Sequence, residues 1–115
     1  MIDAGMNDLM RPALYQARHR VVSVANEAAP AIDVRVVGPV CESSDDFGVH
    51  SLPERMTGKV ALLDAGAYGY SMASVYNGRA LPSEVFVSAG KVTSVAPATR
   101  VEDWVSDRLS RAIVQ

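Results

Sequence analysis

The chain has 115 residues, of which 49% are hydrophobic and 21% charged, and its formal net charge is −2. This length allows one domain at most, with a modest core. The basic residues are spread along the sequence, so we expect no nucleic-acid partner. The longest apolar runs, such as VALL at 60–63, are too short to span a bilayer, and we expect no membrane association. With no signal-peptide pattern and a single cysteine, a cytoplasmic protein is expected.

The first third of the chain predicts strands around one short helix. Residues 2–4 are apolar and stop at a glycine, which is typical of a strand end. In NDLMRPALYQA, Pro12 fits the first position of a short helix, where its missing N–H costs nothing. Residues 18–24 and 32–41 (IDVRVVGPVC) then follow a β-like pattern.

The middle of the chain predicts a loop, a strand and a hairpin. Residues 41–58 lack periodicity and predict a long loop, a feature that in compact domains is usually functional or disordered. Residues 59–66 predict a strand, and Asn77-Gly78 predicts a turn. Residues 83–97 contain two β-rich runs joined at Ala89-Gly90, as in a hairpin.

The C-terminal segment carries the clearest helix signal. Thr99 and Glu102 have the spacing of a capping box, and apolar residues from Val101 to Ala112 then recur on one face. The whole chain therefore predicts about five or six strands in succession, with a short helix near the start and a helix at the end. Strands without alternating helices predict a mainly β fold, an antiparallel sandwich or barrel with helical additions.

Cys41 is the only cysteine, next to Glu42 and shortly before Asp45 and Asp46. A thiol attacks as the thiolate, which nearby positive charge stabilises. The neighbouring carboxylates favour the protonated thiol instead, which argues against a nucleophile and leaves a proton donor open. A metal site that added His50 would have one Cys and one His, fewer than zinc sites use, so we expect no metal. A buried structural cysteine is the plain alternative.

The acidic residues after Cys41 allow two interpretations. Glu42, Asp45 and Asp46 are either a solvated acidic loop or ligands for a substrate ammonium group. The histidines, His19 and His50, support no Ser–His–Asp arrangement by their spacing, and we expect neither to be catalytic.

A possible carboxylate receptor precedes them in the chain. Arg11 and Tyr15 are four residues apart, so both can face one side of a helix that Pro12 opens. A guanidinium fork donates two parallel hydrogen bonds to a carboxylate, and a phenol adds a third. The alternative is a surface arginine packed on a tyrosine. Tyr68 lies in a glycine-flanked turn, where a ligand can approach closely, and its alternative is a core tyrosine.

Three motifs occur in order across residues 3–79: DAGMNDLMRPALY, VVGPVCESSD and DAGAYGYSMASVYNGR. They resemble the C-terminal part of the diaminopimelate decarboxylase family, pyridoxal-phosphate enzymes of the alanine-racemase-like fold. The family converts meso-2,6-diaminoheptanedioate to L-lysine and CO2 in lysine biosynthesis. Its members join an N-terminal (β/α)8 barrel, which carries the Schiff-base lysine, to a β-sandwich domain. They act as homodimers with active sites at the subunit interface.

The resemblance implies roles for the residues already considered. Arg11 and Tyr15 would bind a substrate carboxylate. Cys41 would be the proton donor, offered to the site of the other subunit, and Glu42 would bind the substrate's distal ammonium group, also in trans. Tyr68 would contact both the cofactor, pyridoxal 5′-phosphate, and the amino-acid substrate.

The sequence also departs from a complete enzyme of this family. Its two lysines, Lys59 and Lys91, each follow a glycine at a predicted turn, and no glycine-rich phosphate loop is present. A Schiff-base lysine needs a buried environment. The resemblance therefore implies that residues 1–115 are the C-terminal substrate-binding and dimerisation domain without the (β/α)8 barrel. Residues 1–17 would be the end of the barrel and the connecting segment.

We expect this isolated chain to be inactive, because its residues supply substrate contacts and a proton donor but no cofactor lysine. Three alternatives stay open. The chain could belong to a bifunctional aspartate kinase/diaminopimelate decarboxylase, which the CESSD form resembles. It could be a non-catalytic module that pairs with a separate barrel chain, or a relative that acts on another basic amino acid.

Overall fold

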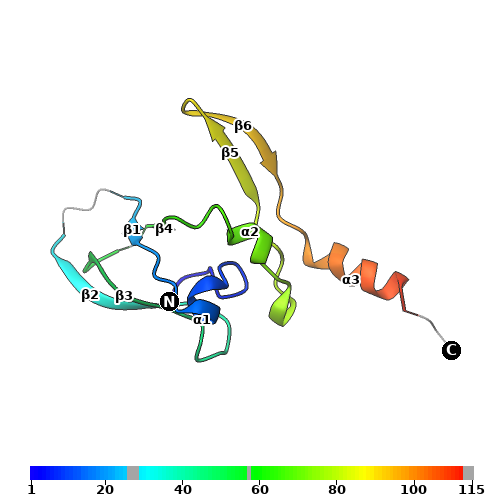
Figure 1. Ribbon diagram of the computed structural model, residues 1–115, viewed down its shortest axis with the longest axis horizontal. Helices are drawn as coiled ribbons and strands as arrows, with labels where there is room; N and C mark the ends of the chain where they lie inside the picture. Colours follow the sequence, from blue (N-terminus) through cyan, green and yellow to red (C-terminus); the bar gives the residue numbers. More distant parts are fainter. Residues whose placement is uncertain (26–28, 57, 113–115) are drawn as a thin grey trace.

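The computed structural model describes residues 1–25, 29–56 and 58–112, and in these the chain is mainly β (Figure 1). Its strands pair antiparallel in three two-stranded sheets: β1 with β4, β2 with β3 and β5 with β6. The mainly β fold with a short first helix and a C-terminal helix is confirmed. In the described ranges the sheets do not close into a barrel. The elements in chain order are α1 (Arg11–Tyr15), β1 (Val21–Ser23), β2 (Ala31–Val37), β3 (Asp46–Pro53), β4 (Val60–Leu62), α2 (Gly69–Met72), the 3-10 helix η1 (Tyr76–Gly78), β5 (Glu84–Ser88), β6 (Lys91–Ala96) and α3 (Val101–Ser110).

The longest strand pair contains a segment for which the sequence predicts a loop. β3 pairs with β2 from Ala31 opposite Pro53 to Val37 opposite Asp46, so the loop prediction is wrong for residues 46–53. Two buried residues of β3, Phe47 and Leu52, lie an odd number of positions apart, so the strand does not show a regular alternation of buried and exposed side chains. The register shift between Val36 and Val37, near Gly48 with its φ of 90°, is the physical reason.

The buried core is small and lies where the N-terminal segment meets the first strands. The buried members of this cluster come from the segment before α1 and from β1, β2 and β3: Leu9, Val21, Val36, Phe47 and Leu52. Residues 2–4 do not form a strand, although the Ile2 N–H donates to the Val37 carbonyl at 2.9 Å. This bond holds the start of the chain beside β2.

The helices begin and end for local reasons. The predicted short helix is present as α1, but it begins at Arg11, so Pro12 is its second residue and not its first; Gln16, with a left-handed φ of 54°, ends the helix. The predicted C-terminal helix is present as α3, but its N-cap is Arg100 and no side chain caps it. The capping box between Thr99 and Glu102 is therefore wrong. The backbone at Arg100 is extended, so Arg100 takes the N-cap position predicted for Thr99, and the helix begins at Val101.

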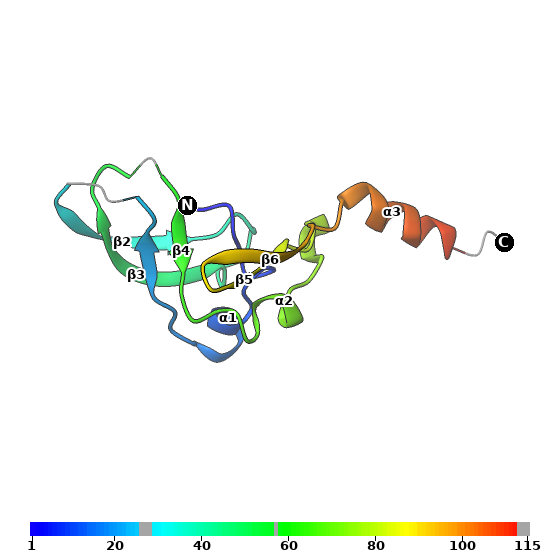
Figure 2. The same ribbon diagram turned by 90° about the horizontal axis from the view of Figure 1, so that it is seen from above.

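The hairpin and the last helix extend away from the core. Figures 1 and 2 show α3 projecting from the body in both views, and the described chain measures 61 × 38 × 26 Å. The hairpin turns at Ala89 and Gly90, whose φ values of 48° and 73° match the predicted two-residue turn. In the part of the chain that the structure describes, no helix is long and apolar enough to cross a membrane.

Candidate substrate-binding site

The turn that carries Cys41 is organised around a buried carboxylate. Asp45 is 3% exposed, and its two oxygens accept hydrogen bonds from the backbone N–H groups of Met6, at 2.7 Å, and Val40, at 2.6 Å. Backbone bonds close the same turn, from Gly38 N–H to the Asp45 carbonyl and from Asp45 N–H to the Glu42 carbonyl. The carboxylate therefore fixes both the shape of the turn and its attachment to the N-terminal segment.

Asp45 fits neither interpretation of the acidic residues, and its neighbour Asp46 is held by contacts of its own. Asp45 is neither a solvated loop residue nor a ligand for a substrate ammonium group, because both of its oxygens are occupied by backbone donors. Asp46 forms an ion pair with Arg35 and accepts a hydrogen bond from the Gly48 N–H at 2.8 Å, across β2 and β3. Of the acidic residues after Cys41, Glu42 is the exposed one that the turn leaves at the surface.

Cys41 and Glu42 lie side by side in the chain at the exposed part of this turn. The thiol of Cys41 is exposed, so the alternative of a buried structural cysteine is wrong. The phenol of Tyr76 in η1 donates a hydrogen bond to Glu42 Oε1. This hydrogen bond, and after it the negative charge of Glu42, raises the pKa of the Tyr76 phenol above its ordinary value.

A second group of side chains meets around Arg11. The guanidinium carbon of Arg11 lies 5.4 Å from the ring centre of Tyr15 and 4.6 Å from that of Tyr68. Tyr15 shares α1 with Arg11, whereas Tyr68 comes from the turn before α2. Both phenols are more than half exposed. A guanidinium stacked on rings keeps its N–H donors in its own plane, where a carboxylate can accept two of them.

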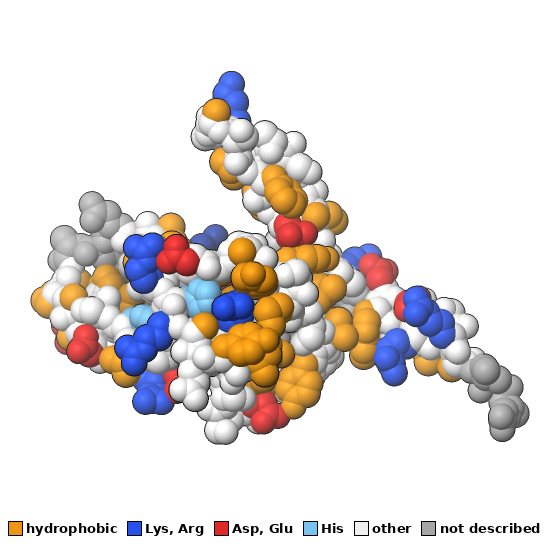
Figure 3. All heavy atoms as spheres, in the orientation of Figure 1, with side chains coloured by type: hydrophobic (Ala, Val, Ile, Leu, Met, Phe, Trp, Pro, Cys, Tyr) orange, Lys and Arg blue, Asp and Glu red, His pale blue; other side chains and the backbone are white. Residues whose placement is uncertain are grey.

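Within the described ranges, no hydrogen bond, ion pair or cation–π contact joins the Arg11 group to the Cys41–Glu42 turn. The structure thus brings Arg11, Tyr15 and Tyr68 together and leaves Cys41 and Glu42 as a separate group. Figure 3 shows hydrophobic side chains gathered around α1 and α2 on the visible face.

The histidines are held by main-chain carbonyls. His19 is buried, and its Nδ1 lies 3.1 Å from the Leu63 carbonyl oxygen, while Nε2 is buried without a partner in the described part of the chain. His50 Nε2 lies 2.8 Å from the Phe47 carbonyl oxygen. These contacts give both rings a structural role within the fold.

Sequence reasoning missed three residues that support the site. Asn7 is fully buried, and its backbone carbonyl accepts a hydrogen bond from the Ser74 N–H at 2.8 Å. Arg79 donates to the Asp3 carbonyl at 2.7 Å, and Tyr76 contacts Glu42. The one available signal was the Asn77-Gly78 turn, which both left-handed φ values, 56° and 70°, confirm. These contacts join residues between 34 and 76 positions apart, which no local pattern encodes.

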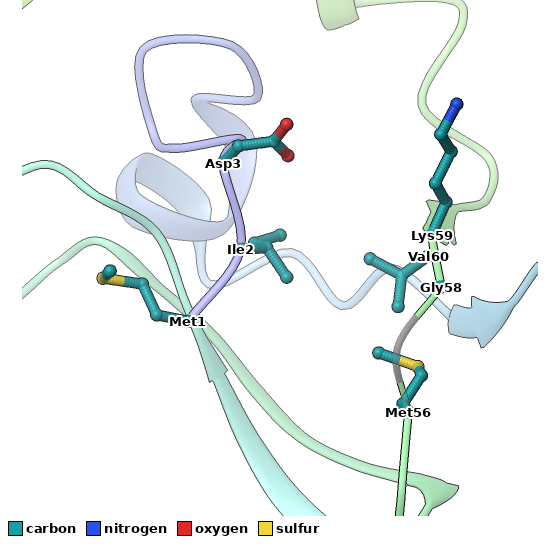
Figure 4. A pocket seen from close by; sticks show the side chains of 7 residues that line it. All are labelled: Met1, Ile2, Asp3, Met56, Gly58, Lys59 and Val60. Carbon is teal, nitrogen blue, oxygen red and sulfur yellow. The ribbon is translucent and has the colours of Figure 1, made fainter.

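The lysines do not fit a covalent pyridoxal-phosphate site. Both Lys59 and Lys91 are exposed, and Lys91 stands at the tip of the hairpin. Lys59 borders a pocket whose apolar side chains include Ile2, Met56 and Val60, but Figure 4 shows its amine pointing away from them. A Schiff-base lysine needs a buried, desolvated environment, which neither of these exposed side chains has. In the described residues, no group of three or more metal-ligating side chains converges either.

Comparisons with known proteins show the family to which the chain belongs. Residues 1–66 match the family described as pyridoxal-dependent decarboxylase, C-terminal sheet domain. The chain belongs to this family. Its relatives include the diaminopimelate decarboxylase from Zymomonas mobilis, which is 40% identical over 109 aligned residues; the alignment covers 93% of this chain and 26% of the relative. The diaminopimelate decarboxylase from Methanocaldococcus jannaschii is 42% identical over 118 aligned positions, which cover 99% of this chain and 25% of the relative.

Solved structures show the same similarity. Diaminopimelate decarboxylase from Methanocaldococcus jannaschii, in complex with L-lysine, matches with a TM-score of 0.85 and 39% identity over 100% of this chain and 26% of that one. The diaminopimelate decarboxylase from Helicobacter pylori, also in complex with L-lysine, matches with a TM-score of 0.81 and 41% identity. The match covers 94% of this chain and 27% of the Helicobacter pylori chain. The chain therefore spans about a quarter of the length of these relatives.

Proposed function

We propose that this chain is the C-terminal, substrate-binding part of a pyridoxal-phosphate-dependent diaminopimelate decarboxylase. The observation that carries the proposal is the meeting of Arg11, Tyr15 and Tyr68, because two distant segments converge on one guanidinium. Membership of the decarboxylase family and the likeness to enzymes crystallised with L-lysine support it.

The substrate proposed is meso-2,6-diaminoheptanedioate, a chain with a carboxylate and an ammonium group at each end. Arg11 and Tyr15 bind a carboxylate by charge-assisted hydrogen bonds. Glu42, exposed beside Cys41, binds the distal ammonium group. Each end of the substrate thereby meets a group of opposite charge, which fixes its orientation.

Cys41 is proposed as the proton donor. Loss of CO2 leaves a carbanion, which must gain a proton to give L-lysine. The thiol of Cys41 is exposed beside Glu42, where a group of a neighbouring subunit can reach it for that step. No hydrogen bond, ion pair or cation–π contact joins the Cys41–Glu42 turn to the Arg11 group in the described residues of one chain. Two subunits of a homodimer can therefore complete one site, with Cys41 and Glu42 acting in trans.

Pyridoxal phosphate, when bound, supplies the electron sink that stabilises the carbanion. Tyr68 is the residue of this chain proposed to contact both the cofactor and the substrate. The cofactor's lysine has to lie outside residues 1–115, since both lysines here are exposed. Residues 1–17 are proposed to be the end of the barrel and the connection to the β domain. As for other amino-acid biosynthetic enzymes, the proposed location is the cytoplasm.

The proposal is tested with a hybrid enzyme. Residues 1–115 replace the matching C-terminal quarter of the Zymomonas mobilis relative, and CO2 release from meso-2,6-diaminoheptanedioate is measured with added cofactor. We expect turnover by the hybrid and none by the isolated chain. A folded, cofactor-loaded hybrid without turnover would contradict the proposed function, and turnover by the isolated chain would contradict the assignment of the lysine to another segment.

A further inference from the structure

The turn that contains Tyr76 is attached to the N-terminal segment on both sides. Before it, the Ser74 N–H donates to the backbone carbonyl of the fully buried Asn7 at 2.8 Å. After it, Arg79 Nη2 donates to the carbonyl of Asp3 at 2.7 Å. The two left-handed residues between these anchors reverse the chain, so Tyr76 projects from a short turn that is fixed at each end.

The Cys41 turn is attached to the same segment. The Asp45 carboxylate accepts the Met6 N–H at 2.7 Å, and the Gly5 N–H in turn donates to the Asp8 carboxylate at 2.8 Å. Residues 3–8 therefore hold two turns that are more than thirty positions apart in sequence. The Tyr76 phenol and the Glu42 carboxylate meet because both turns are anchored to this one segment.

The contact leaves half of the carboxylate available. The Tyr76 phenol donates to Oε1 of Glu42, and a carboxylate has two oxygens with about four acceptor positions. A glutamate side chain that is otherwise exposed samples several rotamers, and a hydrogen bond to a fixed phenol selects one of them. The remaining acceptor positions then keep a constant direction toward a cationic group.

We propose that Tyr76 is a positioning residue that holds the Glu42 carboxylate in place for the distal ammonium group of the substrate. The proposal rests on the proposed function, since Glu42 must bind that group. Tyr76 moves with Glu42 as part of the same subunit, so the pair would enter the site of the other subunit together.

The contact itself is tested in the full 115-residue chain. Carbon-13 labels at Cζ of the tyrosines allow each phenol to be titrated by NMR, with Tyr76→Phe used for assignment. We expect the Tyr76 phenol to titrate above the others, and Glu42→Gln to bring it back toward the ordinary value of about 10. A Tyr76 phenol that titrates with the others and ignores Glu42→Gln overturns the proposal.

The role is tested in the hybrid enzyme by kinetics. Tyr76→Phe should raise KM for meso-2,6-diaminoheptanedioate about tenfold and leave kcat within about twofold, because uniform binding is lost. Tyr70→Phe, which removes another exposed phenol, should leave both constants unchanged. In a Glu42→Ala background, Tyr76→Phe should change KM by less than about twofold, since the two residues act as one unit.

The outcomes separate the two proposals. If Glu42→Ala leaves KM unchanged, the proposed role of Glu42 is wrong, and with it the proposed function of this site. If Glu42→Ala raises KM but Tyr76→Phe behaves like Tyr70→Phe, only the positioning role of Tyr76 is overturned. A fall in kcat with unchanged KM for Tyr76→Phe also contradicts positioning of a bound group.

Discussion

Asp45 is a charged side chain that the fold uses as a structural centre. It is nearly fully buried, no ion pair joins it to a basic residue in the described part of the chain, and two backbone N–H groups take the place of solvent around it. A carboxylate that accepts hydrogen bonds from several backbone N–H groups forms strong hydrogen bonds. Removing the carboxylate leaves these buried N–H groups without acceptors. The exposed pair Cys41–Glu42 thus depends on a buried residue a few positions along.

Gly38 offers a sharp test of this arrangement. A Cβ added there would lie 2.3 Å from Asp45 Oδ1, far inside van der Waals contact. We predict that Gly38→Ala lowers the free energy of unfolding by about 1–3 kcal/mol, because the carboxylate must move away from its donors. The midpoint of urea denaturation, followed by circular dichroism, measures the change.

Gly66→Ala is the matched control for that variant, since a Cβ at Gly66 meets nothing within 4 Å. It should change the unfolding free energy by less than about 0.5 kcal/mol. Equal effects of the two substitutions would mean that the Cys41 turn does not require the close approach of Gly38 to Asp45.

At the scale of elements, α3 differs from the strands that form the core. None of its residues is buried, and its ion pair between Asp107 and Arg111, at 2.8 Å, is exposed. Exposed pairs of this kind contribute about 0.3–0.5 kcal/mol to a helix. The helix is therefore locally stabilised and adds little to the stability of the body.

We predict that a chain ending at Arg100 keeps the melting temperature of the longer chain within about 2 °C, because none of the residues of α3 is buried. Far-ultraviolet circular dichroism during heating measures it. The comparison is a chain that ends before β5, at Ser83, which also removes the hairpin. A large drop on removing α3 alone would show that the helix packs on the body in solution.

At the scale of the whole molecule, much apolar surface faces solvent. In the β5–β6 hairpin, Val85 lies opposite Val95 and Val87 opposite Val92, and all four are more than half exposed. The hairpin stands clear of the core, and its apolar side chains are visible along it (Figures 1 and 3). Exposed apolar patches of this kind favour association.

We predict that the isolated chain self-associates, with a sedimentation coefficient that rises with concentration. Val87→Lys should weaken the association, because it places a charge in the apolar patch. Ser88→Lys adds the same charge at the next exposed position and should have a smaller effect. A concentration-independent monomer in sedimentation velocity would contradict the prediction.

Local patterns in the sequence determined the strands, the helices and the turns whose signals are short in range. Pro12 favoured the first turn of a helix, Ala89-Gly90 closed a hairpin, and Asn77-Gly78 reversed the chain, because each of these effects depends on backbone preferences of adjacent residues. The acidic residues next to Cys41 and the motifs shared with the decarboxylase family are also features of adjacent residues, so the sequence alone reveals them.

Only the tertiary structure decided which polar residues are buried and which meet. Asp45, Glu42 and Asp46 look alike in sequence, yet Asp45 became a buried anchor because Met6, 39 residues away, donates to it. Strand β3 escaped detection because a register shift opposite Gly48 interrupts its alternation. The pairs Arg11–Tyr68 and Glu42–Tyr76 exist because distant turns are attached to one N-terminal segment, and such long-range contacts leave no periodic trace in a sequence.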